Sequence, residues 1–370
     1  MIAAQWHAVA GFLSRAWIPW HPIPLISANT AGHKQARTNE FPRFDANVGT
    51  ELSLEFTACN GFSDYHRSSD CSQFIEFAEF AAPRRFCEDS YPNGMRIALI
   101  QQRASPDKAA NVSRGLKAVE QAADRGAELV AFAELAFEPF YPRCRATPGY
   151  QDLAEPIPGP TTDAFAELAR RHNLVIVLNL FERAGDRCYD CSPVIDADGS
   201  LLGRTRMIHI TDYEGFHERG YYAPGDTGAP VYETRHGRVG VAICYDRHFP
   251  EFMRSLAVAG ADLVVVPQAG TIGEWPDGLY EAELRVAAFQ NGYFTALCNR
   301  VGREGELDFS GESFVCSPAG VVIARAPGGD EGLLLADLDL SATKDSHARR
   351  LFLPDRRPEL YADWLNSRWN

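Results

Sequence analysis

A cysteine at the end of a short apolar run is the first candidate for chemistry in this sequence. The run Val239–Ile243 is rich in β-branched residues and lies between a Gly-containing turn and a polar segment with a proline, which predicts a buried strand that ends at Cys244. Reactive groups collect at the carboxyl ends of the strands in α/β sheets. A helix that begins after the strand would favour the thiolate over the neutral thiol. The position therefore indicates a nucleophilic thiol, and a buried structural cysteine is the alternative.

A carboxylate follows a second apolar run in the same way. Glu134 comes after the run 129–133, which itself follows a segment with helical spacing over 111–126. The ends of parallel strands approach each other, so Glu134 is placed to meet Cys244. A carboxylate beside a thiol takes its proton as a general base, and desolvation raises its pKa into the useful range. A surface or capping carboxylate is the alternative.

Further motifs occur in a fixed order along the chain. They are Arg96–Gln101, Phe132–Leu135, Tyr221–Asp226, the Cys244 segment, Gly260–Asp262 with Val266–Pro267, and Asn299–Gly302. With these motifs the chain resembles the nitrilase superfamily of carbon–nitrogen hydrolases, from about residue 95 to residue 340. The similar branch holds N-carbamoylputrescine amidases, β-ureidopropionases and N-carbamoyl amino acid amidohydrolases.

The resemblance implies a Glu–Lys–Cys constellation. Glu134 matches the general base and Cys244 the nucleophile, which would attack a carbonyl or nitrile carbon, expel an amine or ammonia, and leave a thioester for water to hydrolyse. Glu218 matches a second glutamate that positions the substrate and assists proton transfer. An ordinary loop carboxylate is the alternative for Glu218.

The lysine of this constellation is missing. The family pattern places it two residues before a histidine, and here Met207 precedes His209 at that spacing. If the strand is regular, Arg206 points to the opposite face, whereas His209 shares the face of Met207 and could supply a proton. The family lysine supports the oxyanion together with the N–H of the residue after the cysteine, here Tyr245. Loss of one such donor typically costs on the order of 10²–10³ in rate.

Substrate signals point in two directions. Arg247 stands where related N-carbamoyl amino acid hydrolases grip a substrate carboxylate, a task that suits the guanidinium fork. An ion pair with Asp246 or Glu251 is the alternative. The surroundings of Pro224–Gly228 are instead most similar to N-carbamoylputrescine amidases, which act on a cationic substrate. By analogy with the family, segments 267–271 and 274–276 form a loop over the pocket.

Composition excludes several other classes of protein. The net charge of −13 argues against nucleic acid or an anionic membrane as a partner. No apolar run approaches the length of a membrane span. Nine cysteines and no secretory pattern favour reduced thiols and a cytoplasmic location, and Cys188-Tyr189-Asp190-Cys191 is a lone C-x-x-C without metal ligands nearby. No metal or other cofactor is implied.

Alternating strands and helices predict an α/β fold, and the family implies a four-layer α-β-β-α sandwich. We expect strands near 96–101, 128–133, 174–180, 191–196, 231–234, 239–244, 262–266, 293–299, 312–316, 321–325 and 333–338, and helices near 108–125, 161–172, 250–259 and 279–291. Residues 95–340 form the predicted hydrolase domain. Residues 1–94 are expected to be a disordered extension, or a segment before a native start at Met95. The tail 341–370 is expected to lie within the subunit or at a subunit interface of the homodimer or larger homo-oligomer that the family implies.

Two functions remain open at this stage. The first is a thiol-dependent hydrolase of a small-molecule amide or ureido C–N bond, with Glu134, Cys244 and Glu218 in the roles above. The second is a catalytically silent relative that keeps the pocket for ligand binding or assembly, which Met207 motivates.

Overall fold

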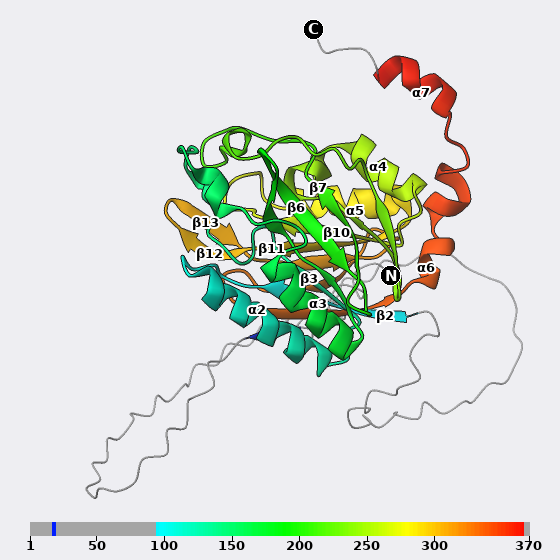
Figure 1. Cartoon of the computed structure of the whole chain (residues 1–370). Coiled ribbons are helices and arrows are strands. Elements are labelled where there is room, and N and C mark those ends of the chain that lie inside the picture. The colour runs from blue at the N-terminus through cyan, green and yellow to red at the C-terminus, as the bar shows by residue number, and fades with distance from the viewer. Residues whose placement is uncertain (1–16, 20–93, 366–370) are drawn as a thin grey trace, which may run out of the picture. The chain divides into compact units, whose positions relative to one another are not determined.

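Two β-sheets packed face to face form the centre of the structure, a computed structural model that describes residues 17–19 and 94–365 (Figure 1). Within these residues, the larger sheet has the strand order β1-β16-β2-β3-β4-β6-β5, and β7 pairs with β6. Its strands are β1 Trp17–Pro19, β2 Gly94–Gln101, β3 Leu129–Phe132, β4 Val175–Val177, β5 Leu180–Ala184, β6 Arg187–Ile195, β7 Leu201–Arg206 and β16 Gly332–Asp339.

The second sheet has the order β15-β14-β11-β10-β9-β8. Its strands are β8 Val231–Thr234, β9 Gly237–Val241, β10 Leu263–Gln268, β11 Phe294–Asn299, β14 Phe314–Cys316 and β15 Val322–Arg325. A separate hairpin consists of β12 Val301–Glu304 and β13 Leu307–Ser310. In both sheets the central strands are parallel, β2 with β3 and β4 in the first and β9 with β10 and β11 in the second.

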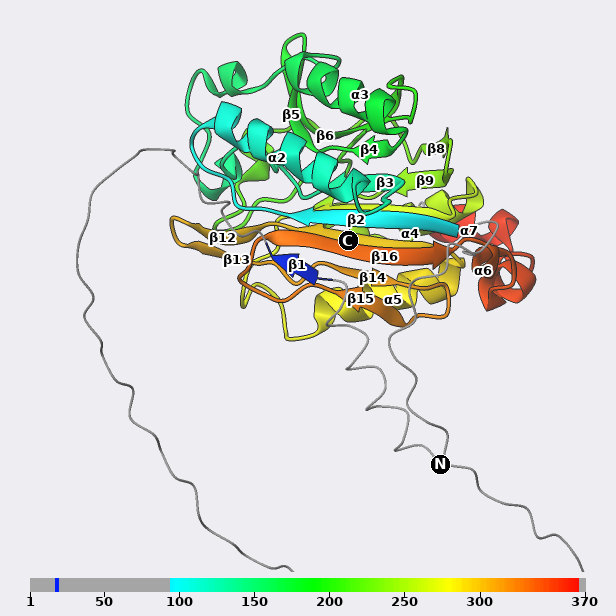
Figure 2. The same cartoon turned by 90° about the horizontal axis from the view of Figure 1, so that it is seen from below.

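Helices cover the outer face of each sheet (Figures 1 and 2). Helices α2 (Lys108–Ala123) and α3 (Pro160–His172) pack on the larger sheet, and α4 (Pro250–Val258) and α5 (Leu279–Asn291) pack on the smaller one. The four-layer α-β-β-α sandwich predicted from the sequence is therefore confirmed. The remaining helices, α6 (Ser341–Lys344) and α7 (Pro358–Leu365), lie in the C-terminal tail.

Strand periodicity divides the buried side chains among these layers. In β2, Ile97 and Leu99 point into the core between the sheets, whereas Ala98 and Ile100 point outward beneath the helices. The central strands β3, β4, β10 and β11 are buried throughout because both of their faces are covered. This explains why they appear in the sequence as continuous apolar runs.

Several predicted elements differ in extent. The strand expected near 191–196 spans Arg187–Ile195, and the hairpin of β12 and β13 was not predicted. Strand β7 ends at Arg206, so residues 207–209 do not continue it as the alternation argument assumed. The expectation for residues 1–94 lies outside the described residues, except that Gly94 begins β2 and Trp17–Pro19 pairs antiparallel with β16.

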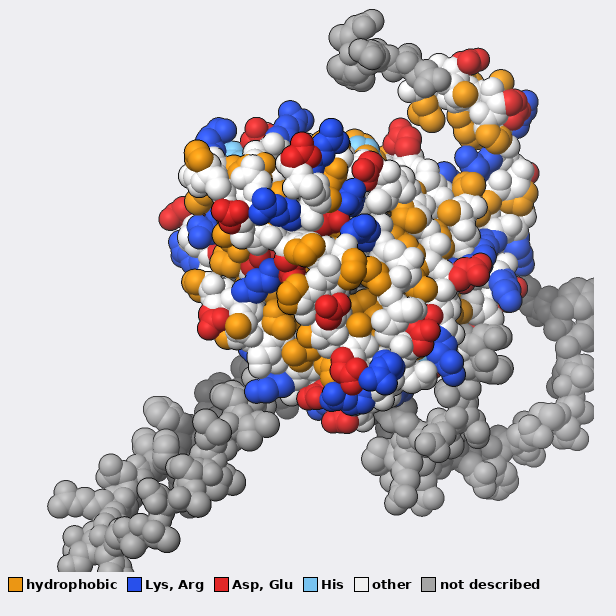
Figure 3. Space-filling view, in the orientation of Figure 1, with side chains coloured by type: hydrophobic (Ala, Val, Ile, Leu, Met, Phe, Trp, Pro, Cys, Tyr) orange, Lys and Arg blue, Asp and Glu red, His pale blue; other side chains and the backbone are white. Residues whose placement is uncertain are grey.

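No helix in the described part of the chain is long and apolar enough to cross a membrane. On the face shown in Figure 3, acidic and basic side chains are interspersed over the described surface, without a field of one sign. This face offers no basic patch of the kind that binds nucleic acid.

Gly115 provides a test of how tightly α2 packs on the larger sheet. A Cβ at this position would lie 2.6 Å from Cε1 of Phe137. Gly→Ala in an exposed helix position gains about 1 kcal/mol of stability, but overpacking a core costs about 1–3 kcal/mol, so the clash should win. We expect Gly115→Ala to lower the free energy of unfolding in urea, whereas Ser113→Ala, on the exposed side of the same helix, should not lower it. A Gly115→Ala protein as stable as the wild type would contradict this packing.

Candidate active site

Three chemically capable side chains converge between the two sheets. Glu134 follows β3, Cys244 follows β9, and Glu218 begins the short 3₁₀ turn Glu218–Gly220. One side-chain atom from each, a carboxylate oxygen or the sulfur, lies within 4.8 Å of the other two. The structure therefore brings together the three residues that the sequence nominated for catalysis.

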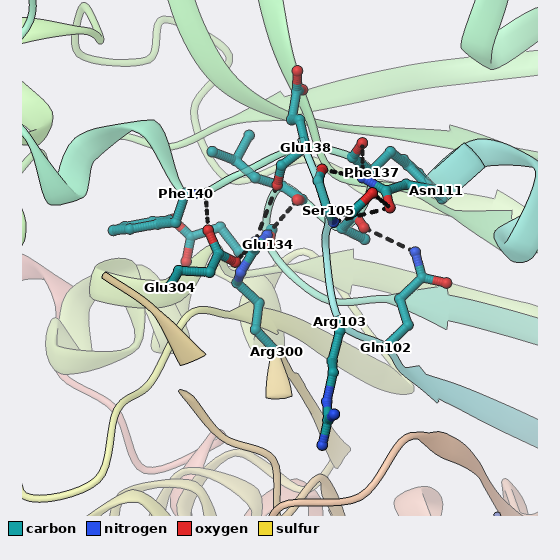
Figure 4. A network of polar contacts seen from close by, with 12 residues as sticks. Gln102, Arg103, Ser105, Asn111, Glu134, Phe137, Glu138, Phe140, Arg300 and Glu304 are labelled. Carbon is teal, nitrogen blue, oxygen red and sulfur yellow. Dashed lines mark hydrogen bonds and ion pairs between the residues drawn. The ribbon is translucent and has the colours of Figure 1, made fainter. Parts of the chain in front are cut away.

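The turn after β3 is held by buried polar side chains (Figure 4). Nη1 of Arg300 donates to the carbonyl oxygens of Glu134, at 2.8 Å, and Leu135, and Nη2 donates to the carbonyl of Glu138 at 3.0 Å. Oδ1 of Asn179 accepts from the N–H of Leu135 at 2.7 Å. Leu135 has a φ of 44°, in the left-handed region that a leucine rarely adopts. These contacts hold a strained turn and thereby fix Glu134 in the core.

Cys244 is also held in a strained backbone position. It has a φ of 42° at the start of the 3₁₀ turn Cys244–His248. Nη1 of Arg247 donates to the carbonyl of Cys244 and to Oε1 of Gln268, both at 2.8 Å, and Nε2 of Gln268 lies 3.3 Å from the sulfur. Tyr245 stands in the first turn, where N–H groups have no intrahelical acceptor, so its N–H can serve a ligand.

Arg247 makes a different ion pair from those considered in the sequence analysis. Its Nε lies 3.2 Å from Oε2 of Glu283, rather than against Asp246 or Glu251, and its guanidinium stacks on the ring of Tyr280. Nη2 of Arg247 is buried without a hydrogen-bond partner among the described residues. One donor of this guanidinium is thus left over for a ligand.

Burial dominates the electrostatics of the Glu134–Cys244 pair. Burial, and then the nearby Glu218 carboxyl, raise the pKa of Glu134 to about 8. Burial, Glu134 and Glu218 together raise the pKa of the Cys244 thiol well above its usual value, and Arg247 lowers it only in part. The resting thiol is therefore neutral. A base with a pKa near 8 suits a proton transfer that occurs as the sulfur attacks.

Two residues at the site were missed in the sequence. Asp190, in β6, and Tyr222 are fully buried, and the charges of Asp190, Glu134 and Glu218 all raise the pKa of the Tyr222 hydroxyl after burial itself. Burial and Glu134 raise the pKa of Asp190 well above its usual range. The sequence feature that could have revealed Asp190 is an acidic residue between Cys188 and Cys191 in an otherwise apolar strand. Both cysteines are free and buried.

Apolar Met207 stands where the family resemblance predicts a lysine. Met207 is fully buried, and its N–H donates to the carbonyl of Asp190 at 2.9 Å. His209 is not beside it, because Nδ1 of His209 bonds Oδ1 of Asp246 at 2.7 Å and its ring stacks on Phe249. Arg206 instead pairs with the buried Glu182. None of these neighbours replaces a lysine ammonium.

Glu274 belongs to the segment that was expected to cover the pocket. Its carboxylate accepts from the hydroxyl groups of Tyr213 and Tyr280, the latter at 2.5 Å. The charges of Glu274 and Cys244 both raise the pKa of Tyr213 after burial, which places this tyrosine near the thiol. The loop therefore contributes a glutamate that links Tyr213, which precedes Glu218, to Tyr280 of α5.

A four-layer sandwich with a thiol and two carboxyl groups buried between its sheets defines a class of cysteine-dependent hydrolases. The sequence model of the family Carbon-nitrogen hydrolase matches residues 96–348, and the chain belongs to this family.

Relatives and solved structures agree with this assignment. The chain is 35% identical over 282 residues to an N-carbamoylputrescine amidase from Solanum lycopersicum, covering 72% of this chain and 93% of that one. It is 32% identical over 279 residues to a citrullinase from Francisella tularensis, covering 72% and 96%. A carbon–nitrogen hydrolase from Helicobacter pylori has a TM-score of 0.70 at 29% identity, covering 75% and 100%. A mutant amidase from Nesterenkonia sp. AN1, with the acetamide moiety of fluoroacetamide covalently added at its active-site cysteine, has a TM-score of 0.62 at 28% identity, covering 73% and 96%.

The raised pKa of Glu134 predicts a stability that depends on pH. The folded protein keeps a proton that the unfolded chain releases above about 4.5, so this group lowers stability as the pH rises from about 4.5 to about 8. We expect Glu134→Gln to raise the free energy of unfolding at pH 8.5 by up to about 4 kcal/mol relative to its effect at pH 5. Urea unfolding at both pH values measures this, with exposed Glu233→Gln as the control. An equal effect of Glu134→Gln at both pH values would contradict the raised pKa.

Proposed function

We propose that the chain hydrolyses a non-peptide C–N bond of an amide or N-carbamoyl (ureido) compound through a thioester on Cys244. The observation that carries the proposal is the position of Cys244, at positive φ and within 4.8 Å of two buried glutamates. The covalent adduct on the cysteine of the Nesterenkonia amidase supports a nucleophilic role for the matching residue here. The N-carbamoylputrescine amidase and citrullinase relatives support a ureido substrate.

Each residue of the site has a separate role in the proposed reaction. Glu134 takes the thiol proton as the sulfur attacks, and returns it to the departing nitrogen. Glu218 positions the substrate and, with Glu134, activates the water that cleaves the thioester. Gln268 and the N–H of Tyr245 face the developing oxyanion. The unpartnered Nη2 of Arg247 binds an anionic or carbonyl oxygen of the substrate.

Met207 supports a second candidate function. A buried thioether in place of a cation removes one donor from the site, a loss of on the order of 10²–10³ in rate for a typical oxyanion donor. A catalytically silent protein that keeps the pocket for ligand binding or assembly would carry this feature.

Ammonia release from the full chain over N-carbamoyl amino acids, N-carbamoylputrescine, simple amides and nitriles distinguishes the two functions. Turnover should disappear in Cys244→Ala and persist in Cys316→Ala, which removes a buried cysteine outside the site. On amides, Met207→Lys should raise the rate by on the order of 10² because it restores a charged donor. Turnover that survives Cys244→Ala would overturn the mechanism, and absence of turnover in the wild type and Met207→Lys would favour the binding protein.

We also propose that the chain pairs with a second copy through its C-terminal tail. Large apolar side chains are exposed there, namely Leu351, Phe352, Leu360, Trp364 and Leu365. Such a group on one segment is typical of an interaction surface. Light scattering should give at least a dimer for the wild type and a smaller species for a Leu360→Asp/Leu365→Asp double variant. A wild-type monomer would contradict the pairing.

A further inference from the structure

The site contains several buried oxygens without a partner. Both carboxylate oxygens of Glu134, Oδ2 of Asp190, Oε1 of Glu218 and the hydroxyl of Tyr222 are buried and form no well-aligned hydrogen bond among the described residues. Glu134 nevertheless lies close enough to the Asp190 carboxyl and the Cys244 thiol for both to affect its pKa. The charges of these groups act on one another's pKa values, so they surround one space. Buried polar atoms are normally satisfied, and a whole set without partners indicates a ligand.

Among the described residues, two arginines offset the charge of this group only in part. The N–H groups of Arg300 that point to the site are taken by the backbone carbonyls of the turn after Glu134, and its charge is a minor influence on the Glu134 pKa. Arg247 is directed to the carbonyl of Cys244, to Gln268 and to Glu283, and only its Nη2 has no partner. Met207, which adjoins Asp190 through a backbone hydrogen bond, is uncharged. The described residues thus place three carboxyl groups around the thiol with only a partial counter-charge.

A ligand that both neutralises these carboxyl groups and satisfies their unpartnered oxygens is a cation that carries several N–H donors. A buried carboxylate is stabilised by charge-assisted hydrogen bonds, and planar N–H donors fit carboxylate pairs best. An amidinium or guanidinium group has both features, and its central carbon is itself an electrophile for a thiolate.

The direction of charge development favours the same group. When sulfur adds to an amide, negative charge grows on oxygen, and stabilisation requires donors aimed at that oxygen. Glu134, Asp190 and Glu218 are acceptors when ionised, so they oppose an oxyanion. When sulfur adds to an amidinium carbon, no negative charge develops on the substrate, and its N–H groups remain donors before and after the addition. Acceptors bind such a group in both states, whereas they repel an oxyanion.

We propose that the preferred electrophile of Cys244 is the carbon of an amidinium or guanidinium compound, whose N–H groups are bound by Glu134, Asp190 and Glu218. This substrate class rests on the proposed function, because it uses the same nucleophile and base.

The reaction balances with water as the only co-substrate. The sulfur of Cys244 forms a bond to the central carbon and its proton passes to Glu134, giving a tetrahedral adduct. Glu134 returns the proton to one nitrogen, which leaves as ammonia and gives an S-linked amidinium. Water then adds to this carbon as Glu134 takes one of its protons, the C–S bond breaks as the carbonyl forms, and the hydroxyl proton passes to the sulfur. The proton left on Glu134, which corresponds to the positive charge of the substrate, leaves with ammonia as ammonium. Loss of ammonia from a guanidinium gives a ureido product, and loss from an amidinium gives an amide.

A matched pair of reagents tests the proposal on the full chain. Chloroacetamidine and chloroacetamide have nearly the same shape and differ in the cationic amidinium and the neutral carbonyl. Intact-mass spectrometry with peptide mapping gives the rate at which each alkylates Cys244, and glutathione gives the intrinsic ratio of the two reagents. We expect Cys244 to prefer the amidine by about tenfold or more over glutathione, as one or two charge-assisted hydrogen bonds would produce.

Variants separate the acidic group from general reactivity. Asp190→Asn keeps an oxygen for Asn179 and should reduce the preference about tenfold. Met207→Lys should abolish the preference by adding a competing cation, and Met207→Leu should retain it. Circular dichroism of each variant shows that it is folded.

Each outcome has a separate meaning. A preference no greater than that of glutathione, together with turnover of amides or ureido compounds, overturns the amidinium proposal and leaves the proposed function standing. Labelling by both reagents no faster than glutathione, with no turnover, overturns both. A preference that appears only in the presence of EDTA would show that a metal ion bound by Glu134, Glu218 and Cys244 occupies this space, and would also overturn the proposal.

Discussion

The burial of three carboxyl groups and a thiol between two apolar sheets is the constraint on which the rest of the site depends. Transferring an ionised carboxylate into such an interior is costly, and in practice the group takes up a proton or finds a cation. The raised pKa values of Glu134, Asp190 and Glu218 express the first response. The fold tolerates them because apolar strands and the helices outside them bury a large apolar area around a small polar centre. Part of that stability offsets the cost of keeping a reactive site dry.

Two arginines fix the positions of Glu134 and Cys244 by binding backbone carbonyls. Arg300 binds the carbonyls of the turn after β3, and Arg247 binds the carbonyl at Cys244. Both turns contain a non-glycine residue at positive φ, Leu135 and Cys244, a conformation that persists only when its surroundings hold it. The two guanidiniums thus hold the strained turns that carry the proposed base and the proposed nucleophile, and they contribute little free positive charge to the space around them. This division explains how a site with buried arginines nearby remains acidic.

The sequence predicted the residues at strand ends better than those within strands. Glu134 and Cys244 could be placed because each follows an apolar run, and the parallel sheet brings such ends together. Asp190 was not identified, because an acidic residue inside a strand can be assigned to a face only when the register of that strand is known. The predicted strand also began one residue too late to contain Asp190. Arg300 was part of a motif, but its role was not identified, since its partners are backbone carbonyls far away in the chain and no side-chain pattern marks them. The four-layer fold followed from the order of elements and the family resemblance, whereas the end of β7 at Arg206 depends on tertiary contacts that periodicity does not contain.

Proton uptake and cation binding are competing ways to neutralise the same three carboxyl groups, and this competition links ligand charge to pH. A cation bound among Glu134, Asp190 and Glu218 must displace their protons, so its binding releases protons and weakens as the pH falls. A neutral amide displaces none, and it finds the protonated carboxyls as donors, so its binding is favoured at low pH. Met207 matters for this balance because an apolar residue there cannot neutralise the carboxyl groups. Their charge must then be neutralised by protons from the solvent or by the ligand. Under the amidinium proposal, an apolar residue at position 207 does more than leave out a donor to an oxyanion. It would also decide which charge on the substrate the site can stabilise, and a calorimetric count of protons released on binding distinguishes the two kinds of ligand.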